Sequence, residues 1–179
     1  DRPTEFARDV YLKAPVLAIP RVTSGRREYL PVGYFDKNTI ISEQAFQVPV
    51  TSTVLFSILS SRHHCLWLGM VGGRLKGDYR YSNTLVYNTF PIPKMSHTIQ
   101  KNLKDSAKNI LEIEKRYFQD GADLADMFDP NLMPSDLRHA LQNNDAMFDK
   151  LYGIKSSTDT SRLSSLIQHY ADMKAHKDV

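Results

Sequence analysis

The chain has 179 residues, which is enough for one large domain or two small ones. Hydrophobic residues make up 41% of it, as in an ordinary globular protein, and no apolar run approaches the roughly 18–20 residues of a membrane helix. A single cysteine, Cys65, cannot form an intrachain disulfide, and the charged start of the chain does not resemble a signal peptide. These features predict a cytoplasmic protein that makes no membrane contact.

The formal net charge of +3 is unevenly distributed along the chain. Residues 1–95 carry 12 Lys and Arg against 7 Asp and Glu, whereas residues 96–179 carry 11 against 13. A modest basic excess in one half can attract a polyanion without causing non-specific binding over the whole chain. Chance asymmetry between two domains would give the same numbers, so charge alone does not decide between these explanations.

Short strand patterns fill much of the first half of the chain. The apolar run Val16–Pro20 predicts a buried strand that ends at its proline. Further strands are expected at residues 29–34, 39–41, 43–50 and 84–87. Polar turns are expected at residues 21–28, built on Ser24 and Gly25, and at residues 36–38.

Helical periodicity appears once in the first half and continues through the second. Apolar residues at helical spacing predict a helix over 51–71, capped at Ser52 or Thr53 and ended by Gly72. Residues 88–93 form an extended segment that continues neither helix nor strand, and Pro91, Pro93 and Ser96 mark a domain boundary. Three more helices are predicted, at 99–121, 135–152 and 159–174. We therefore expect an α+β fold, with a mixed α/β domain at residues 1–95 and a small all-α domain at residues 96–179.

The sharpest candidate site is the loop expected at residues 74–80, where charged and aromatic residues alternate. A lysine ammonium can donate hydrogen bonds to guanine O6 and N7 in the major groove, while a carboxylate can accept one from the cytosine N4 amine. Lys76 and Asp78, two residues apart, could therefore read both halves of one G·C pair. Arg74 and Arg80 beside them suit phosphate or guanine. A solvated charged loop without a ligand is the alternative.

A second polar cluster lies near the start of the chain. Arg21, Ser24, Arg26 and Arg27 could bind phosphates through their side chains and through turn amides. Adjacent arginines are common in surface loops, so this cluster is not specific by itself.

Signals for a metal site and for catalysis are missing from the sequence. His63, His64 and Cys65 are adjacent, so on a helix they point in different directions, and no CxxC or HxxxH partner accompanies them. The chain contains no glycine-rich phosphate loop, no nucleophile elbow and no spaced acid cluster for magnesium. We therefore predict neither catalytic residues nor metal ligands in this chain.

Three segments in a fixed order carry a resemblance to a known family. They are IPRVTSGRREYLPVGYF at residues 19–35, LSSRHHCLWLGMVGGRLKGDYRYSNTLVYNTFPIP at 59–93, and LADMFDPNLMPSDLRHALQNNDAMFDKLYG at 124–153. Together they resemble the C-terminal part of the MmeI-like DNA methyltransferases, the type IIL restriction–modification enzymes and their methylase-only relatives.

The resemblance implies a division of labour within a longer protein. In that family an upstream methyltransferase domain binds S-adenosylmethionine and methylates adenine N6, so no cofactor is expected in this chain itself. Residues 1–95 would form the target-recognition domain, which binds double-stranded DNA, and residues 96–179 a helical C-terminal domain. The family reads one base pair with two residues in the loop before the Tyr-Arg-Tyr-Ser run, which here are Lys76 and Asp78. A second reading position is implied near Glu43 and Gln44.

An interpretation from another functional class stays open on the sequence alone. The basic first half could belong to an adaptor module that binds RNA or a protein partner. The two interpretations predict different sequences upstream of this chain, because only a methyltransferase needs a cofactor-binding glycine loop and an Asn/Asp-Pro-Pro-aromatic motif there.

Overall fold

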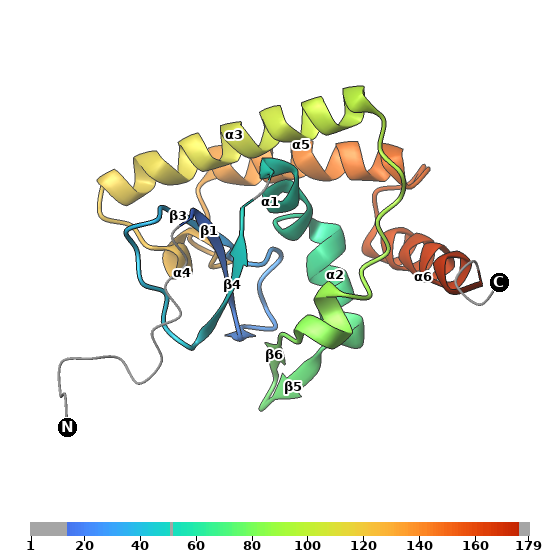
Figure 1. Cartoon of the computed structure of the whole chain (residues 1–179), viewed down its shortest axis with the longest axis horizontal. Helices are drawn as coiled ribbons and strands as arrows, with labels where there is room; N and C mark the ends of the chain where they lie inside the picture. The colour runs from blue at the N-terminus through green and yellow to red at the C-terminus, as the bar shows by residue number, and fades with distance from the viewer. Residues whose placement is uncertain (1–13, 51, 176–179) are drawn as a thin grey trace.

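The computed structural model describes residues 14–50 and 52–175 of the chain, and it combines two small antiparallel sheets with a set of helices (Figure 1). The elements, in chain order, are β1 (Val16–Pro20), β2 (Val22–Thr23), β3 (Gly33–Phe35), β4 (Ala45–Pro49), α1 (Thr53–Leu59), α2 (Arg62–Val71), β5 (Gly73–Leu75), β6 (Asp78–Arg80), the π-helical turn η1 (Asn83–Tyr87), α3 (His97–Gln119), α4 (Leu124–Met127), α5 (Ser135–Leu151) and α6 (Asp159–Ala175). The predicted α+β fold class is confirmed. None of the helices formed by the described residues is long and apolar enough to cross a membrane.

The first sheet has the strand order β3-β1-β4, with β1 in the centre. The strand predicted at Val16–Pro20 is confirmed. It is paired on both edges, and its first four residues are buried. The strand predicted at 29–34 starts only at Gly33, since Pro31 has no N–H to give to a ladder. The strand predicted at 39–41 is wrong. The start of that segment is instead bonded to the preceding turn, where the Thr39 hydroxyl donates to the Asp36 side chain at 3.1 Å.

The second sheet has the order β2-β6-β5 and was not predicted. Strands β5 and β6 form a hairpin whose two-residue turn is Lys76-Gly77, with positive φ angles of 57° and 132°. The segment predicted as an open loop is therefore a regular hairpin, and β2 extends it by pairing with β6. The strand predicted at 84–87 is also wrong, because Ser82 caps a π-helical turn there and its hydroxyl accepts from Leu85 N.

The helix predicted over 51–71 is two helices, α1 and α2, separated at Ser60 and Ser61. Ser61 caps α2 by accepting from His64 N at 3.1 Å, which favours a new helix start rather than continuation. The N-cap at Ser52 and the C-cap at Gly72 are confirmed. Helices α3, α5 and α6 are confirmed as well, whereas the short α4 was missed.

The two halves of the chain share one hydrophobic core. Helix α3 packs on α1 and α5, and α6 packs on α2, so helices of the second half cover the helices of the first (Figure 1). Hydrogen bonds also join the two halves: the Tyr152 hydroxyl donates to Pro91 O at 2.6 Å, and the Ser57 hydroxyl donates to the Asn144 side chain. The sequence suggested two domains that fold separately, but this shared core favours cooperative folding.

Cooperative folding gives a direct prediction for Leu141→Ala. Leu141 lies in α5 and is fully buried, so its truncation should cost about 2–5 kcal/mol and lower Tm by roughly 5–15 °C. Trp67, the only tryptophan, lies in α2 of the first half and packs against Tyr170 of α6, so its fluorescence reports on the contact between the two halves, away from α5. Melting followed by Trp67 fluorescence and by far-UV circular dichroism should shift by the same amount. A fluorescence transition that stays in place would contradict the shared core, and Leu132→Ala, at a 64% exposed side chain, is the control.

Candidate nucleic-acid interface

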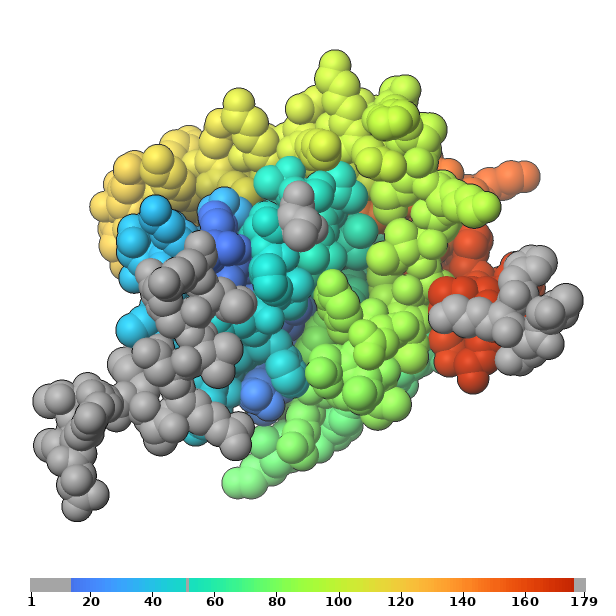
Figure 2. Space-filling model, in the orientation of Figure 1, coloured from blue at the N-terminus to red at the C-terminus, as the bar shows by residue number. Residues whose placement is uncertain are grey.

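The β5–β6 hairpin protrudes from the side of the molecule opposite α3 (Figure 1). In Figure 2 it forms the pale green projection at the lower edge, beside surface coloured cyan. Lys76 occupies the turn and Asp78 begins the returning strand, and both residues are exposed. The structure therefore places an ammonium and a carboxylate at the exposed tip of the β5–β6 hairpin, whose strand β6 is also paired with β2. A hairpin tip of this kind could enter a major groove.

The two faces of this second sheet differ in character. Tyr79 is half-buried and faces α2, with the guanidinium carbon of Arg74 4.1 Å from its ring centroid. Arg74 also donates to Gly69 O at 3.3 Å, so its guanidinium is held against the helix. Side chains alternate along a strand, so Asp78 and Arg80 share the opposite, outer face of the sheet.

Arg21 joins the two sheets and connects the two candidate reading positions. Its backbone N–H donates to Gln44 O at 2.9 Å, and its carbonyl accepts from Tyr81 N at 2.9 Å. Its Nε donates to Glu43 O at 2.5 Å, and its guanidinium carbon lies 4.3 Å from the centroid of the Phe46 ring. The exposed pair at 43–44 is thereby fixed beside strand β6.

The arginines of the 24–27 turn lie in different environments. Arg26 is exposed, and its backbone N–H donates to the Ser24 hydroxyl at 3.3 Å. Arg27 is half-buried, and it donates to the Thr23 hydroxyl and to Ala125 O, both at 3.1 Å. Arg27 thus ties β2 to α4, and its guanidinium is less available to a ligand than that of Arg26.

His63, His64 and Cys65 lie on α2 and are buried in the interior of the protein. Burial lowers the pKa of His63 to about 4 and that of His64 to about 3, so both rings are neutral at pH 7. Burial also raises the pKa of the Cys65 thiol to about 11, so it is not a reactive thiolate. His64 Nε2 lies 2.9 Å from the Tyr81 hydroxyl. Within residues 14–50 and 52–175, no group of three or more His, Cys, Asp or Glu is arranged to hold a metal ion.

Comparison with known families covers nearly the whole chain. The profile described as "MmeI, target recognition domain" matches residues 1–94, and the profile described as "MmeI, C-terminal domain" matches residues 95–176. The chain belongs to the MmeI family. The family resemblance noted in the sequence is therefore confirmed.

Two relatives extend this assignment. DNA methyltransferase A of Bacillus subtilis (strain 168) is 35% identical over 158 residues, which cover 88% of this chain and 18% of that protein. The structure of the type IIL restriction–modification enzyme MmeI in complex with DNA matches 97% of this chain and 23% of that chain, with a TM-score of 0.89 and 35% identity. This MmeI-family chain therefore spans roughly a fifth of the length of these two relatives.

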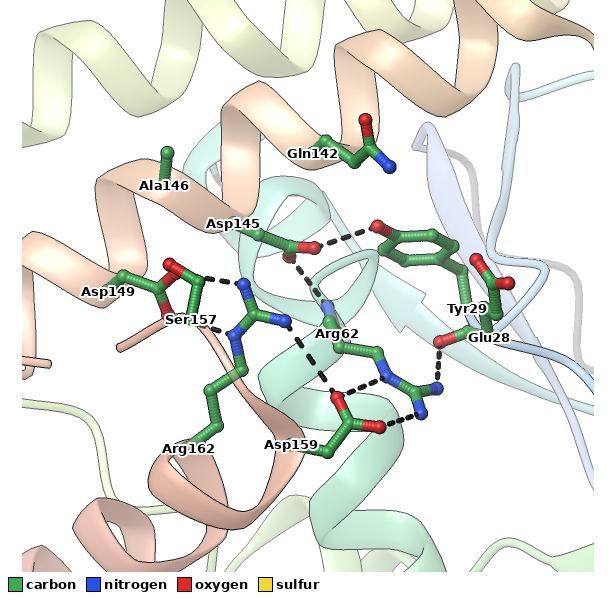
Figure 3. Close-up of a pocket in the computed structure, with 10 residues that line it drawn as sticks. All are labelled: Glu28, Tyr29, Arg62, Gln142, Asp145, Ala146, Asp149, Ser157, Asp159 and Arg162. Carbon is green, nitrogen blue, oxygen red and sulfur yellow. Dashed lines mark hydrogen bonds and ion pairs between the residues drawn. The ribbon is translucent and has the colours of Figure 1, made fainter. Parts of the chain in front are cut away.

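A polar cavity of about 450 Å³ lies between the two regions matched by the MmeI profiles (Figure 3). Arg62 of α2 pairs with Asp159 of α6 at 2.6 Å, and Arg162 of α6 pairs with Asp149 of α5 at 2.8 Å. The Tyr29 hydroxyl donates to Asp145 at 2.8 Å. The cavity is lined by Glu28, Tyr29, Arg62, Gln142, Asp145, Ala146, Asp149, Ser157, Asp159 and Arg162.

This network joins the halves of the chain rather than presenting free charges. Burial raises the pKa of Asp145 to about 7, and that carboxylate also accepts from Arg62 N at 2.8 Å. The network was not predictable from the sequence, because Arg62 and Asp159 are 97 positions apart and no local pattern connects them. The network therefore adds polar contacts to the hydrophobic core that the two regions share.

Proposed function

We propose that this chain is the DNA sequence-recognition region of a site-specific adenine-N6 DNA methyltransferase of a restriction–modification system. The observation that carries this function is the exposed pair Lys76 and Asp78 on a protruding hairpin of an MmeI target recognition domain. The relatives support it, since one is named a DNA methyltransferase and the other is an MmeI enzyme in complex with DNA.

The chemistry of the hairpin pair matches one base pair. Lysine presents only donors and suits the acceptor edge of guanine, while aspartate presents only acceptors and suits the cytosine amine. The pair at 43–44 is the second reading position, where the Glu43 carboxylate could accept from cytosine N4 and the Gln44 amide could bind adenine N6 and N7. Arg21 keeps this pair at a fixed distance from β6.

From their contacts, we assign two roles to the five arginines of the candidate surface. Arg26 and Arg80 are exposed and suit phosphate contacts, together with Ser24 and the turn amides. Arg21, Arg27 and Arg74 bind carbonyl oxygens or stack on aromatic rings, so they position the reading elements. This proposal differs from the phosphate contacts predicted for these three side chains from the sequence, which stay a prediction.

The methyl transfer itself would take place in other parts of a longer protein. An upstream domain would bind S-adenosylmethionine and receive the target adenine after it leaves the duplex stack. Residues 1–95 would hold the DNA, and the helical domain at 96–179 would brace them through the shared core and the polar network.

Binding of the chain to duplex DNA at several salt concentrations tests this function. Replacing Arg26 or Arg80 by alanine should weaken binding to all sequences alike and reduce the slope of log K against log salt by about one unit, because fewer counterions are released. Lys101→Ala is the control, since Lys101 is exposed on α3, far from the hairpin (Figure 1). Equally tight binding to duplex RNA, or slopes that neither arginine variant changes, would contradict the proposed function and favour an adaptor module.

A further inference from the structure

The tip of the hairpin rests against the turn that follows β2. Gly25 N lies 3.4 Å from the Asp78 carboxylate oxygen Oδ1, a long hydrogen bond. A Cβ atom on Gly25 would lie only 2.7 Å from Gly77 O, closer than real Cβ contacts allow. The turn and the hairpin therefore touch backbone to backbone, at the point where Lys76 and Asp78 are presented.

Glycine is needed at position 25 for space and not for its conformation. The described glycines with positive φ are Gly77, Gly121 and Gly153, so the backbone at Gly25 is one that alanine can adopt. The atom that a Cβ would meet is a carbonyl oxygen of the hairpin turn rather than the end of a flexible side chain. Relief of that contact would require the hairpin tip to move.

The tip is held in position mainly by its neighbours. Lys76 has a φ of 57°, a left-handed conformation that costs a non-glycine residue free energy, so surrounding contacts must maintain it. Strand β2 holds the other side of this contact, because Thr23 is buried and pairs with Tyr79 of β6. The backbone of the turn at Gly25 thus limits how closely the hairpin tip can approach, and so sets the position of the tip.

We propose that Gly25 is a specificity-determining positioning residue, which sets where the hairpin presents Lys76 and Asp78 to the DNA. This inference rests on the proposed function. Hydrogen bonds to base edges require donor–acceptor distances of about 2.7–3.2 Å, so a displacement of a few tenths of an ångström at the tip weakens both contacts of the pair. In this role Gly25 acts through the hairpin and does not need to contact a base.

Selection of preferred sites from randomised DNA duplexes, performed with Gly25→Ala, tests this role. The base pair concerned is identified as the one whose preference is lost in Lys76→Ala. Gly25→Ala should lower discrimination at that pair about tenfold, and leave the other positions, the salt slope and Tm unchanged. Gly73→Ala is the matched control on the same hairpin, because a Cβ there would meet its nearest atom, Arg80 Cβ, at an ordinary 3.5 Å.

The outcomes separate this inference from the proposed function. Wild-type preferences retained in Gly25→Ala would overturn the positioning role and leave the proposed function intact. Discrimination lost at every position together with a lowered Tm, or loss of the cooperative transition, would also overturn it, because Gly25 would then be a general folding residue. A wild-type chain that selects no sequence at all would overturn both.

Discussion

Exchanging the charges of the hairpin pair, as Lys76→Asp together with Asp78→Arg, should reverse the orientation of one G·C pair in the preferred site. The new acid would accept from cytosine where the lysine donated to guanine, and the new arginine would bind guanine bidentately. Each matched contact contributes about 1–3 kcal/mol of discrimination, so the change in preference should be roughly 100-fold or more. The rest of the site should be kept, because Glu43 and Gln44 lie in another loop.

The hairpin should tolerate this exchange. Aspartate adopts the left-handed conformation of position 76 more readily than lysine, and Asp-Gly is a favoured sequence for a two-residue hairpin turn. The single variants Lys76→Asp and Asp78→Arg are the controls. Each should lose binding to both orientations, because one side chain of the pair would face a base group of like hydrogen-bonding character.

Glu114→Gln should stabilise the protein at alkaline pH. Glu114 of α3 is 2% exposed, and its Oε1 has no hydrogen-bond partner among the described residues. Burial raises the pKa of this carboxyl from 4.5 to about 8, so the folded state holds a proton that the unfolded state releases. The free energy of unfolding therefore falls as pH rises from about 4.5 to about 8 and is level above that.

Glutamine does not titrate, so the variant should gain over the wild type as pH rises, by at most roughly 3–5 kcal/mol at pH 9 and by almost nothing at pH 4. Denaturant unfolding at pH 4, 7 and 9 measures this difference. Glu112→Gln on the same helix is the control, because its 65% exposed side chain forms only a 3.8 Å surface pair with Lys108. A stability gain that is equal at all three pH values would contradict a buried, titrating Glu114.

The parts of the fold that the sequence predicted are those with a strong local pattern. Strand β1 is a continuous apolar run, and α3, α5 and α6 carry helical periodicity, which prolines and glycines bound in α3 and α5. The missed elements have no such pattern. Strands β2, β5 and β6 have two or three residues each. Strand β2 exists because it pairs with β6, more than 50 positions away, and β5 and β6 are too short to show an alternating pattern although they pair locally.

The sequence indicated the candidate residues at the hairpin tip but not the contacts that hold the hairpin in place. The charges and spacing of Lys76 and Asp78 indicated a reading pair, and the structure leaves both exposed. The roles of Arg21, Arg27 and Arg74 were not predictable, because an arginine in a sequence does not reveal whether its guanidinium binds a carbonyl oxygen of the same chain. Such contacts depend on tertiary packing.

Selection of preferred sites from randomised DNA duplexes, run side by side on the wild-type chain and the double exchange variant, tests most directly whether this chain reads DNA sequence. The wild type should enrich a defined site containing one G·C pair of fixed orientation. The variant should enrich the same site with that pair reversed. Enrichment of an unchanged site by the variant would show that Lys76 and Asp78 do not read bases, and no enrichment by the wild type would contradict sequence recognition by this chain.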